Sequence, residues 1–289
     1  MTHATPRVHS ALGETPDGLE WLRLSTGDRP PLVYFPGLID ASFSPKELLK
    51  RRVKLFAPWC AWRTVYVVSR RRPLAPTWSM AHMAEDYARA VRWILDQEGG
   101  GRSRIDVAGA SFGGCVAMQF ALDTPQLVRR LVLQQVAARG DPARQAQARE
   151  WIGQLDRNEY LTFARTVVRQ SYPQRPRWVN DLVALATWPL VLGGQFERRC
   201  GDLAQSLRAI DGYDVMARLG EVRVPTLVIA GALDDMVPLA LVRETAASLP
   251  HARLHVFEDA GHSAQVKHPH EYAQVMGDFL DAPGDARGA

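Results

Sequence analysis

The sequence predicts an α/β fold in which a mostly parallel sheet is flanked by helices, and two observations carry this prediction. First, short apolar runs rich in β-branched residues recur along the chain. Several of them lack the polar alternation of a half-exposed strand, as expected for parallel strands buried on both faces. Second, helical patterns lie between these runs. Such alternation is typical of a parallel sheet with helices on both faces.

The strands are predicted from six apolar runs. They are Leu32–Phe35, Thr64–Val68, Ile105–Ala108, Leu131–Leu133, Thr226–Ala230 and Leu254–Phe257. Four helices are expected among them. The first begins at the cap Ser79 and stops at the glycine run 99–101. The other three are expected from Ser111 towards Pro125, over about 239–249, and over about 269–280.

The alternation breaks between residues 138 and 213, where the pattern favours no strand and aromatic residues are frequent. We interpret this segment as a helical insertion. The strand pattern resumes at Val222. We therefore expect a core formed by residues 1–137 and 214–289, and a separate helical unit over residues 138–213.

The composition is that of an ordinary globular protein, with 289 residues, 46% hydrophobic and 23% charged. The net charge is only +4 and the arginines are scattered, so we expect no nucleic-acid partner. No apolar run approaches the roughly 18 residues of a membrane span. The three cysteines, Cys60, Cys115 and Cys200, form no CxxC pair, and the start of the chain lacks an apolar signal core. These features predict a cytoplasmic protein without disulfides or a metal site.

A serine motif marks the first candidate for chemistry. Gly109-Ala110-Ser111-Phe112-Gly113 follows a predicted strand and opens a predicted helix. A serine on such a tight turn needs small neighbours, because larger side chains would clash there. The turn lifts the serine Oγ out of the sheet and places a helix N-terminus behind it.

Two further motifs follow predicted strands. Asp234 and Asp235 lie in Gly231–Pro238, directly after the strand that ends at Ala230. His262 lies in the run 259–263, after the last predicted strand. Serine, acid and histidine thus appear in that order, each at the carboxyl end of a strand. Open α/β sheets bind their ligands at this edge.

With these motifs the chain resembles the α/β-hydrolase superfamily, over about residues 20–281. The resemblance implies an α/β-hydrolase fold with a helical cap, or lid, inserted between strands 6 and 7. It maps the nucleophile to Ser111, the acid to Asp234 and the base to His262. The usual spacing of the acid after the glycine favours Asp234, with Asp235 as the competing carboxylate.

The resemblance also implies an oxyanion hole of two backbone N–H groups, those of Leu38 and Phe112. Many members have His-Gly where this chain has Pro36-Gly37. A second departure is the run Arg70, Arg71 and Arg72, where many relatives have a glycine-rich turn. These arginines are candidate contacts for an anionic substrate group, and the alternative is a solvated charge cluster.

The predicted function is that of a serine hydrolase. It would cleave an ester or a related small carboxylic derivative through an acyl-serine intermediate, on a small and partly apolar substrate, with no cofactor and no metal. Serine at position 111 argues against haloalkane dehalogenases and epoxide hydrolases, which use aspartate there. Carbon–carbon bond hydrolases, lactonases, thioesterases and perhydrolases keep the same triad and stay open. So does a slow-turnover ligand-binding receptor of the same fold.

Overall fold

The computed structural model describes residues 7–192 and 196–283, and one eight-stranded sheet runs through them. The strands are β1 (His9–Glu14), β2 (Glu20–Ser25), β3 (Pro31–Phe35), β4 (Thr64–Val68), β5 (Ile105–Ala110), β6 (Val128–Gln134), β7 (Thr226–Gly231) and β8 (Ala252–Phe257). Their order in the sheet is β1-β2-β4-β3-β5-β6-β7-β8. All neighbours from β4 to β8 pair in parallel, which confirms the predicted fold class.

The six predicted strands correspond to β3 through β8, whereas β1 and β2 are absent from the prediction. β1 is almost wholly exposed, and no apolar run marks it. β2 pairs antiparallel with both β1 and β4 and buries Leu22 and Leu24. A strand at the edge of a sheet needs no continuous apolar run, because only part of its surface reaches the core.

The described residues form ten α-helices. They are α1 (Leu49–Phe56), α2 (Met80–Glu98), α3 (Phe112–Asp123), α4 (Pro142–Asp156), α5 (Tyr160–Ser171), α6 (Arg177–Leu192), α7 (Phe196–Ile210), α8 (Leu239–Ser248), α9 (Ala264–Lys267) and α10 (Pro269–Asp281). Apolar residues of α2 and α3 pack on one face of the sheet, and those of α1 and α10 pack on the other. Both faces are therefore buried, as the continuous apolar strands predict.

Helix α2 shows how local sequence sets an element's ends. The Ser79 side chain accepts a hydrogen bond from the His82 backbone N–H, and the His82 ring accepts one from the Ser79 backbone N–H. This reciprocal pair satisfies two N–H groups that the helix itself leaves open. The helix ends at Gly99, whose φ of 63° suits glycine. The cap and the stop both agree with the sequence prediction.

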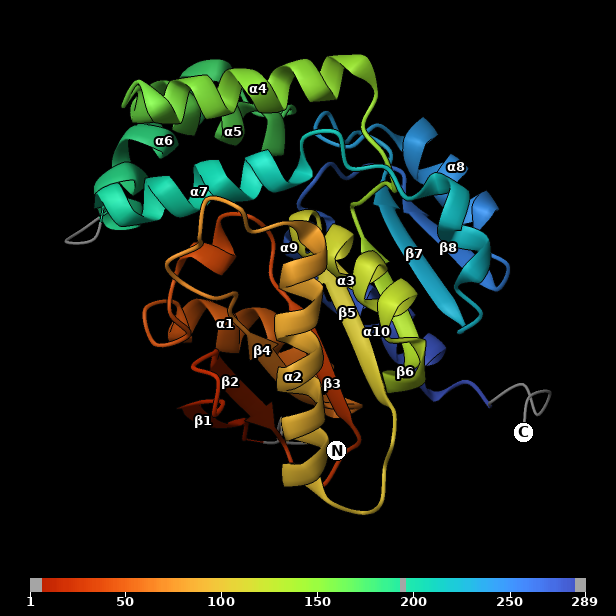
Figure 1. Ribbon diagram of the computed structural model, residues 1–289. Helices are drawn as coiled ribbons and strands as arrows, with labels where there is room; N and C mark the ends of the chain where they lie inside the picture. Colours follow the sequence, from red (N-terminus) through yellow and green to blue (C-terminus); the bar gives the residue numbers. More distant parts are fainter. Residues whose placement is uncertain (1–6, 193–195, 284–289) are drawn as a thin grey trace, which may run out of the picture.

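Helices α4 to α7 lie between β6 and β7 and form a layer of their own beyond one end of the strands (Figure 1). Their apolar faces share a separate core that includes Trp151, Phe163 and Leu203. The two ends of this segment meet, because Arg139 and Asp214 form a β-bridge and the Val215 N–H donates to the Ala138 carbonyl at 3.0 Å. The chain thus leaves and re-enters the sheet at one place. We call α4 to α7 the helical layer.

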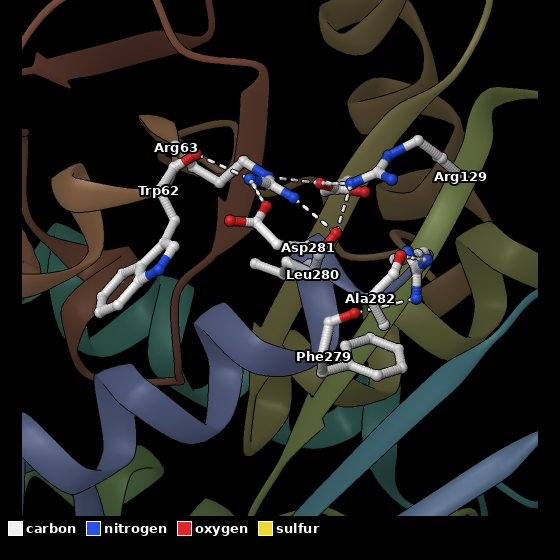
Figure 2. A network of polar contacts seen from close by, with 9 residues as sticks. Trp62, Arg63, Arg129, Phe279, Leu280, Asp281 and Ala282 are labelled. Carbon is white, nitrogen blue, oxygen red and sulfur yellow. Dashed lines mark hydrogen bonds and ion pairs between the residues drawn. The ribbon is translucent and has the colours of Figure 1, made fainter. Parts of the chain in front are cut away.

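At the opposite end of the sheet, arginines hold the last turn of α10. Arg63, Arg129 and Arg130, which we call the α10 arginine cluster, stand beside the amino ends of β4 and β6. Arg63 donates to the Leu280 carbonyl at 2.7 Å (Figure 2). It also pairs with buried Asp106 at 2.7 Å. Arg130 donates to the Phe279 and Ala282 carbonyls. These cations satisfy carbonyls that the helix end leaves open, and they oppose its dipole.

Candidate active site

Ser111 sits on a strained turn between β5 and α3, with φ of 51° and ψ of −121°. Two glycines permit the turn. A Cβ on Gly109 would lie 2.3 Å from the Gly113 carbonyl oxygen, and one on Gly113 would lie 2.1 Å from that of Phe35. Both contacts are with backbone, so a larger residue would have to displace the chain. A non-glycine residue in such a conformation costs about 1–3 kcal/mol, which the surrounding packing must offset.

The candidate acid and base are in direct contact. His262 Nδ1 lies 2.8 Å from Asp234 Oδ2. The other carboxylate oxygen, Oδ1, accepts hydrogen bonds from the N–H groups of Met236 at 2.9 Å and Val237 at 3.0 Å. A carboxylate only accepts, so Nδ1 carries the proton and Nε2 is the basic nitrogen. Asp235 is exposed, and the contact with His262 is made by Asp234.

Two loops hold this pair together. The Leu233 N–H, in the turn after β7, donates to the Ala260 carbonyl at 2.9 Å in the loop after β8. A Cβ on Gly231 would lie 2.4 Å from the carbonyl oxygens of Ala260 and Gly261, so the loops touch backbone to backbone. The Asp234 side chain is only 1% exposed, against 13% for His262. A buried carboxylate therefore orients a histidine that keeps part of its side chain exposed.

Ser111 opens onto a cavity of about 160 Å³ between the sheet and the helical layer. Its lining combines the loop after β3, the serine turn, the turn after β7 and the helical layer. It includes Leu38, Phe112, Cys115, Arg144, Trp151, Leu207, Met236 and Val237. Met236 and Val237 belong to the turn that holds Asp234, so one cavity touches both motifs. Ser111 Oγ makes no hydrogen bond with His262 among the described residues. Catalytic contacts of this kind often tighten only when substrate is bound.

The two candidate oxyanion donors face the same cavity. Leu38 and Phe112 both line it, and no described group accepts the backbone N–H of either residue. The loop that carries Leu38 lies against the serine turn, since a Cβ on Gly37 would be 3.8 Å from Ser111 Cβ. Proline at position 36 leaves this approach intact. The structure thus brings both N–H groups near Ser111.

The three arginines after β4 are absent from the lining of this cavity, and each has a partner elsewhere. Arg71 donates two hydrogen bonds of 3.0 Å to Asp86. Arg72 pairs with Glu20. Arg70 is buried and donates to the Leu38 carbonyl at 3.2 Å and to Ser42 Oγ at 3.1 Å. Arg70 is thus buried, while Arg71 and Arg72 are partly exposed and paired with carboxylates.

Arg144 is a cavity residue that sequence reasoning missed. It lies in the first turn of α4 and donates to the Asp235 carbonyl. Its nearest carboxylate oxygen belongs to Asp141 and is 3.9 Å away. A lone arginine on a helix carries no pattern that separates it from others, so no sequence signal could have found it.

Cys115, on the helix behind Ser111, also lines the cavity. Burial raises the pKa of its thiol to about 12. A protonated thiol is a weak nucleophile, so Cys115 is a packing residue here. Within 7–192 and 196–283, no group of three or more histidine, cysteine or acidic side chains is placed to hold a metal ion. Over the same ranges no helix has the length and apolarity that a bilayer crossing requires.

The chain belongs to the alpha/beta hydrolase fold family, whose model matches residues 68–269. Among curated proteins, it is similar to a 2-hydroxymuconate semialdehyde hydrolase of Pseudomonas sp., with 29% identity over 246 residues. That match covers 79% of this chain and 83% of the relative. A 2-hydroxy-6-oxononadienedioate/2-hydroxy-6-oxononatrienedioate hydrolase, also of Pseudomonas sp., is 28% identical over 204 residues, covering 67% of this chain and 68% of the relative.

Solved structures agree on the fold. An alpha/beta hydrolase enzyme from a Medee basin deep-sea metagenome library superposes with a TM-score of 0.75 at 17% identity, covering 93% of this chain and 97% of that chain. The enol-lactonase of Burkholderia xenovorans superposes with a TM-score of 0.67 at 18% identity, covering 94% and 96%. The fold class and the family are thereby established, and the protein is of a hydrolase family.

Proposed function

We propose that the protein is a serine hydrolase in which Ser111 is the nucleophile, His262 the general base and Asp234 the residue that orients His262. The observation that carries this proposal is the His262–Asp234 contact of 2.8 Å, because the turn that holds Asp234 lines, through Met236 and Val237, the cavity onto which Ser111 opens. Serine is a poor nucleophile at its own pKa and needs a base of this kind. The Leu38 and Phe112 N–H groups form the oxyanion hole of the proposal.

The reaction would proceed in two halves. His262 Nε2 takes the Ser111 proton as Oγ attacks the substrate carbonyl carbon. The carbonyl oxygen becomes an oxyanion, which accepts hydrogen bonds from the N–H groups of Leu38 and Phe112. When the tetrahedral adduct collapses, His262 returns the proton to the leaving group and an acyl-serine remains. Water, deprotonated by His262, then attacks the acyl carbon, and Ser111 recovers its proton as the acid departs.

The substrate class in this proposal is an ester or a related small carboxylic derivative. The cavity of about 160 Å³ suits a small acyl group, and its walls are largely apolar side chains such as Trp151, Leu207 and Val237. Helices α4 and α7 supply part of this lining, which supports the proposed role of residues 138–213 as a cap. The cytoplasmic location stays part of the proposal, supported by three unpaired cysteines that are all buried.

A second candidate is hydrolysis of a carbon–carbon bond beside a ketone, on the same triad. The similar curated proteins are named for oxo-dienedioate and semialdehyde substrates, at 28% and 29% identity. Arg144 favours a carboxylate-bearing substrate of this kind, because its guanidinium lines the cavity with its nearest carboxylate oxygen 3.9 Å away. Arginine binds carboxylates through paired N–H groups.

The proposal is tested by labelling with a fluorophosphonate probe. The wild-type protein should label and should hydrolyse short p-nitrophenyl esters, and Ser111→Ala and His262→Ala should do neither. Ser263→Ala is the matched control, since this serine neighbours His262 but stands outside the triad, and it should label normally. A folded wild type that neither labels nor turns over any acyl substrate, and that retains a ligand, would be a binding protein instead.

Three substrates distinguish the second candidate function, carbon–carbon bond hydrolysis, from ester hydrolysis. The wild type is assayed on a neutral p-nitrophenyl ester, on its carboxylate-bearing hemiester and on a 2-hydroxy-6-oxo-dienoate. Arg144→Met should raise KM about 10- to 100-fold more for the carboxylates than for the neutral ester, the range of a lost charged hydrogen bond. Arg149→Met, on the same helix but 61% exposed, is the control. Equal losses on all three substrates would remove Arg144 from carboxylate recognition.

A further inference from the structure

The loop that carries Leu38 is held by its carbonyl groups. The Gly37 carbonyl accepts the Ala41 N–H at 2.9 Å, and the Leu38 carbonyl accepts Arg70 Nη1 at 3.2 Å and Ser42 Oγ at 3.1 Å. The Asp40 carbonyl accepts Arg52 Nη2 at 2.7 Å. The Ile39 and Asp40 carbonyls accept the N–H groups of Ser42 and Phe43, whereas the Leu38 carbonyl accepts only side-chain donors among the described residues.

Three arginines donate hydrogen bonds to carbonyls of this loop. Arg52 comes from α1, and Arg70 and Arg72 follow β4; we call them the loop arginine cluster. Arg72 Nη1 donates to the Ser42 carbonyl at 3.1 Å. Arg70 also donates from Nη2 to Ser42 Oγ at 3.1 Å, so one guanidinium reaches both Leu38 and Ser42. Arg70 therefore bridges the two ends of the segment 38–42.

Burying the Arg70 guanidinium costs desolvation free energy. It is 3% exposed, and none of the ion pairs among the described residues includes it. The carboxylate that acts on it most strongly, that of Asp202, already accepts the Leu74 N–H at 2.7 Å. Burial lowers the pKa of Arg70 to about 10, yet the group stays charged near neutral pH. Burying a cation that has no carboxylate in an ion pair costs desolvation free energy that a carbonyl and a hydroxyl offset only in part, so stability alone does not explain this cation.

We propose that Arg70 is a positioning residue for the oxyanion hole, which it orients through the Leu38 carbonyl and Ser42. This inference rests on the proposed function, because it assigns Arg70 a role only if the Leu38 N–H binds an oxyanion. Arg70 does not line the cavity and so acts through the loop.

Peptide geometry links the carbonyl contacts to the N–H direction. The Gly37 carbonyl and the Leu38 N–H belong to one planar trans peptide and point opposite ways. Since the Gly37 carbonyl faces the Ala41 N–H, the Leu38 N–H points away from the loop's interior. Arg70 holds the next peptide plane through the Leu38 carbonyl. With both planes fixed, the donor is in place before the oxyanion forms, which is the condition for strong stabilisation.

The guanidinium also contributes its charge. A buried cation behind the loop stabilises an anion in the hole more than the same charge in water would, since the local dielectric is low. Position and charge together predict that Arg70 acts on the transition state and much less on substrate binding.

The test compares Arg70→Met and Arg70→Lys with Arg130→Met. Arg130 is the matched control, because it is also buried and also makes two hydrogen bonds, in its case to two backbone carbonyls at the far end of the sheet. The assays are kcat and KM on a p-nitrophenyl ester. Inhibition is measured with an aryl trifluoromethyl ketone, whose adduct with Ser111 is an oxyanion, and with the matched methyl ketone.

We expect Arg70→Met to lower kcat about 10- to 100-fold with KM nearly unchanged, somewhat less than the loss of an oxyanion donor itself. Its affinity for the trifluoromethyl ketone should fall by the same factor, while the methyl ketone binds as before. Arg70→Lys should retain part of kcat, because one ammonium keeps the charge and one of the two contacts. Arg130→Met should keep kcat and both affinities.

Two outcomes overturn the inference while the proposed function stands: an active wild type with unchanged kcat in Arg70→Met, or equal loss of affinity for both ketones. If Arg70→Met does not fold, Ser42→Ala decides, because it removes only the hydroxyl that joins Arg70 to Leu38. It should lower kcat about 3- to 10-fold, as expected for one neutral hydrogen bond. Unchanged kcat there overturns the inference too. An inactive, unlabelled wild type would instead reject the proposed function.

Discussion

At both ends of the sheet, arginine side chains donate hydrogen bonds to backbone carbonyls, but the two sets of contacts stabilise different features. At the amino ends of the strands, the α10 arginine cluster donates to carbonyls of the last helical turn and is organised around Asp106, a carboxylate with no exposure. At the carboxyl ends, the loop arginine cluster donates to carbonyls of the segment 38–42, and Arg52 and Arg70 have no carboxylate in an ion pair among the described residues. The first cluster completes a helix end, and the second fixes a loop beside Ser111.

The difference shows how to distinguish an arginine that stabilises the fold from one that positions a loop before the reaction begins. An arginine that shares a buried carboxylate should matter for folding, because its partner is left with an unpaired charge when it is lost. An arginine that holds only carbonyls beside a reaction site should matter for rate. The following experiments break or sharpen this contrast.

The largest effect is expected at the site end, in the acid that orients His262. Asp234→Asn should lower kcat about 10⁴-fold, because an amide no longer fixes the imidazole tautomer or stabilises its protonated form. Asp235→Asn, one residue away and exposed, should stay within about twofold. Steady-state ester hydrolysis measures both. If the Asp235 variant suffers the larger loss, the contact with His262 is not the one used in catalysis.

The next largest effect is expected at the amino ends of the strands, and it concerns the free energy of unfolding. Asp106→Ala should lower the free energy of unfolding by about 3–5 kcal/mol, because it leaves buried Arg63 without its buried carboxylate partner. Urea unfolding gives this value, and kcat per folded molecule should not change. Asp281→Ala is the control, since its carboxylate contacts the same arginine but is 52% exposed. That variant should lose about 1 kcal/mol or less. A fall in kcat for Asp106→Ala would mean that the two ends are coupled.

The smallest effect concerns the three thiols. Burial raises the pKa values of Cys60, Cys115 and Cys200 to about 12, from 9.0. A raised thiol pKa stabilises the fold below pH 9, and this contribution is lost as the pH rises from 9 towards 12, since the unfolded state ionises first. At pH 8 we expect no reaction with Ellman's reagent until urea unfolds the chain. Rapid labelling of Cys115 alone would show that the cavity opens in the folded state.

Much of the fold and the candidate site could be predicted from sequence because the signals are local. Gly109 and Gly113 flank Ser111 for a steric reason that acts within five residues, and Asp234 and His262 follow apolar runs directly. β1 could not be found this way, because an exposed edge strand carries no apolar run. The contacts of the arginines after β4 could not be predicted for a different reason. Arg72 meets Glu20 across 52 positions and Arg71 meets Asp86 across 15, so their partners depend on tertiary structure.

The bridge between Arg139 and Asp214, with the hydrogen bond from Val215 to Ala138, has an evolutionary consequence. Because the helical layer joins the sheet through a paired stem, the layer can be exchanged or shortened without opening the strands β6 and β7. Closing the stem with a short turn would carry only a small entropic penalty. The fold therefore lets the helical layer, which forms part of the cavity wall, be altered in length or sequence while the sheet and the loops that carry Ser111, Asp234 and His262 stay in place.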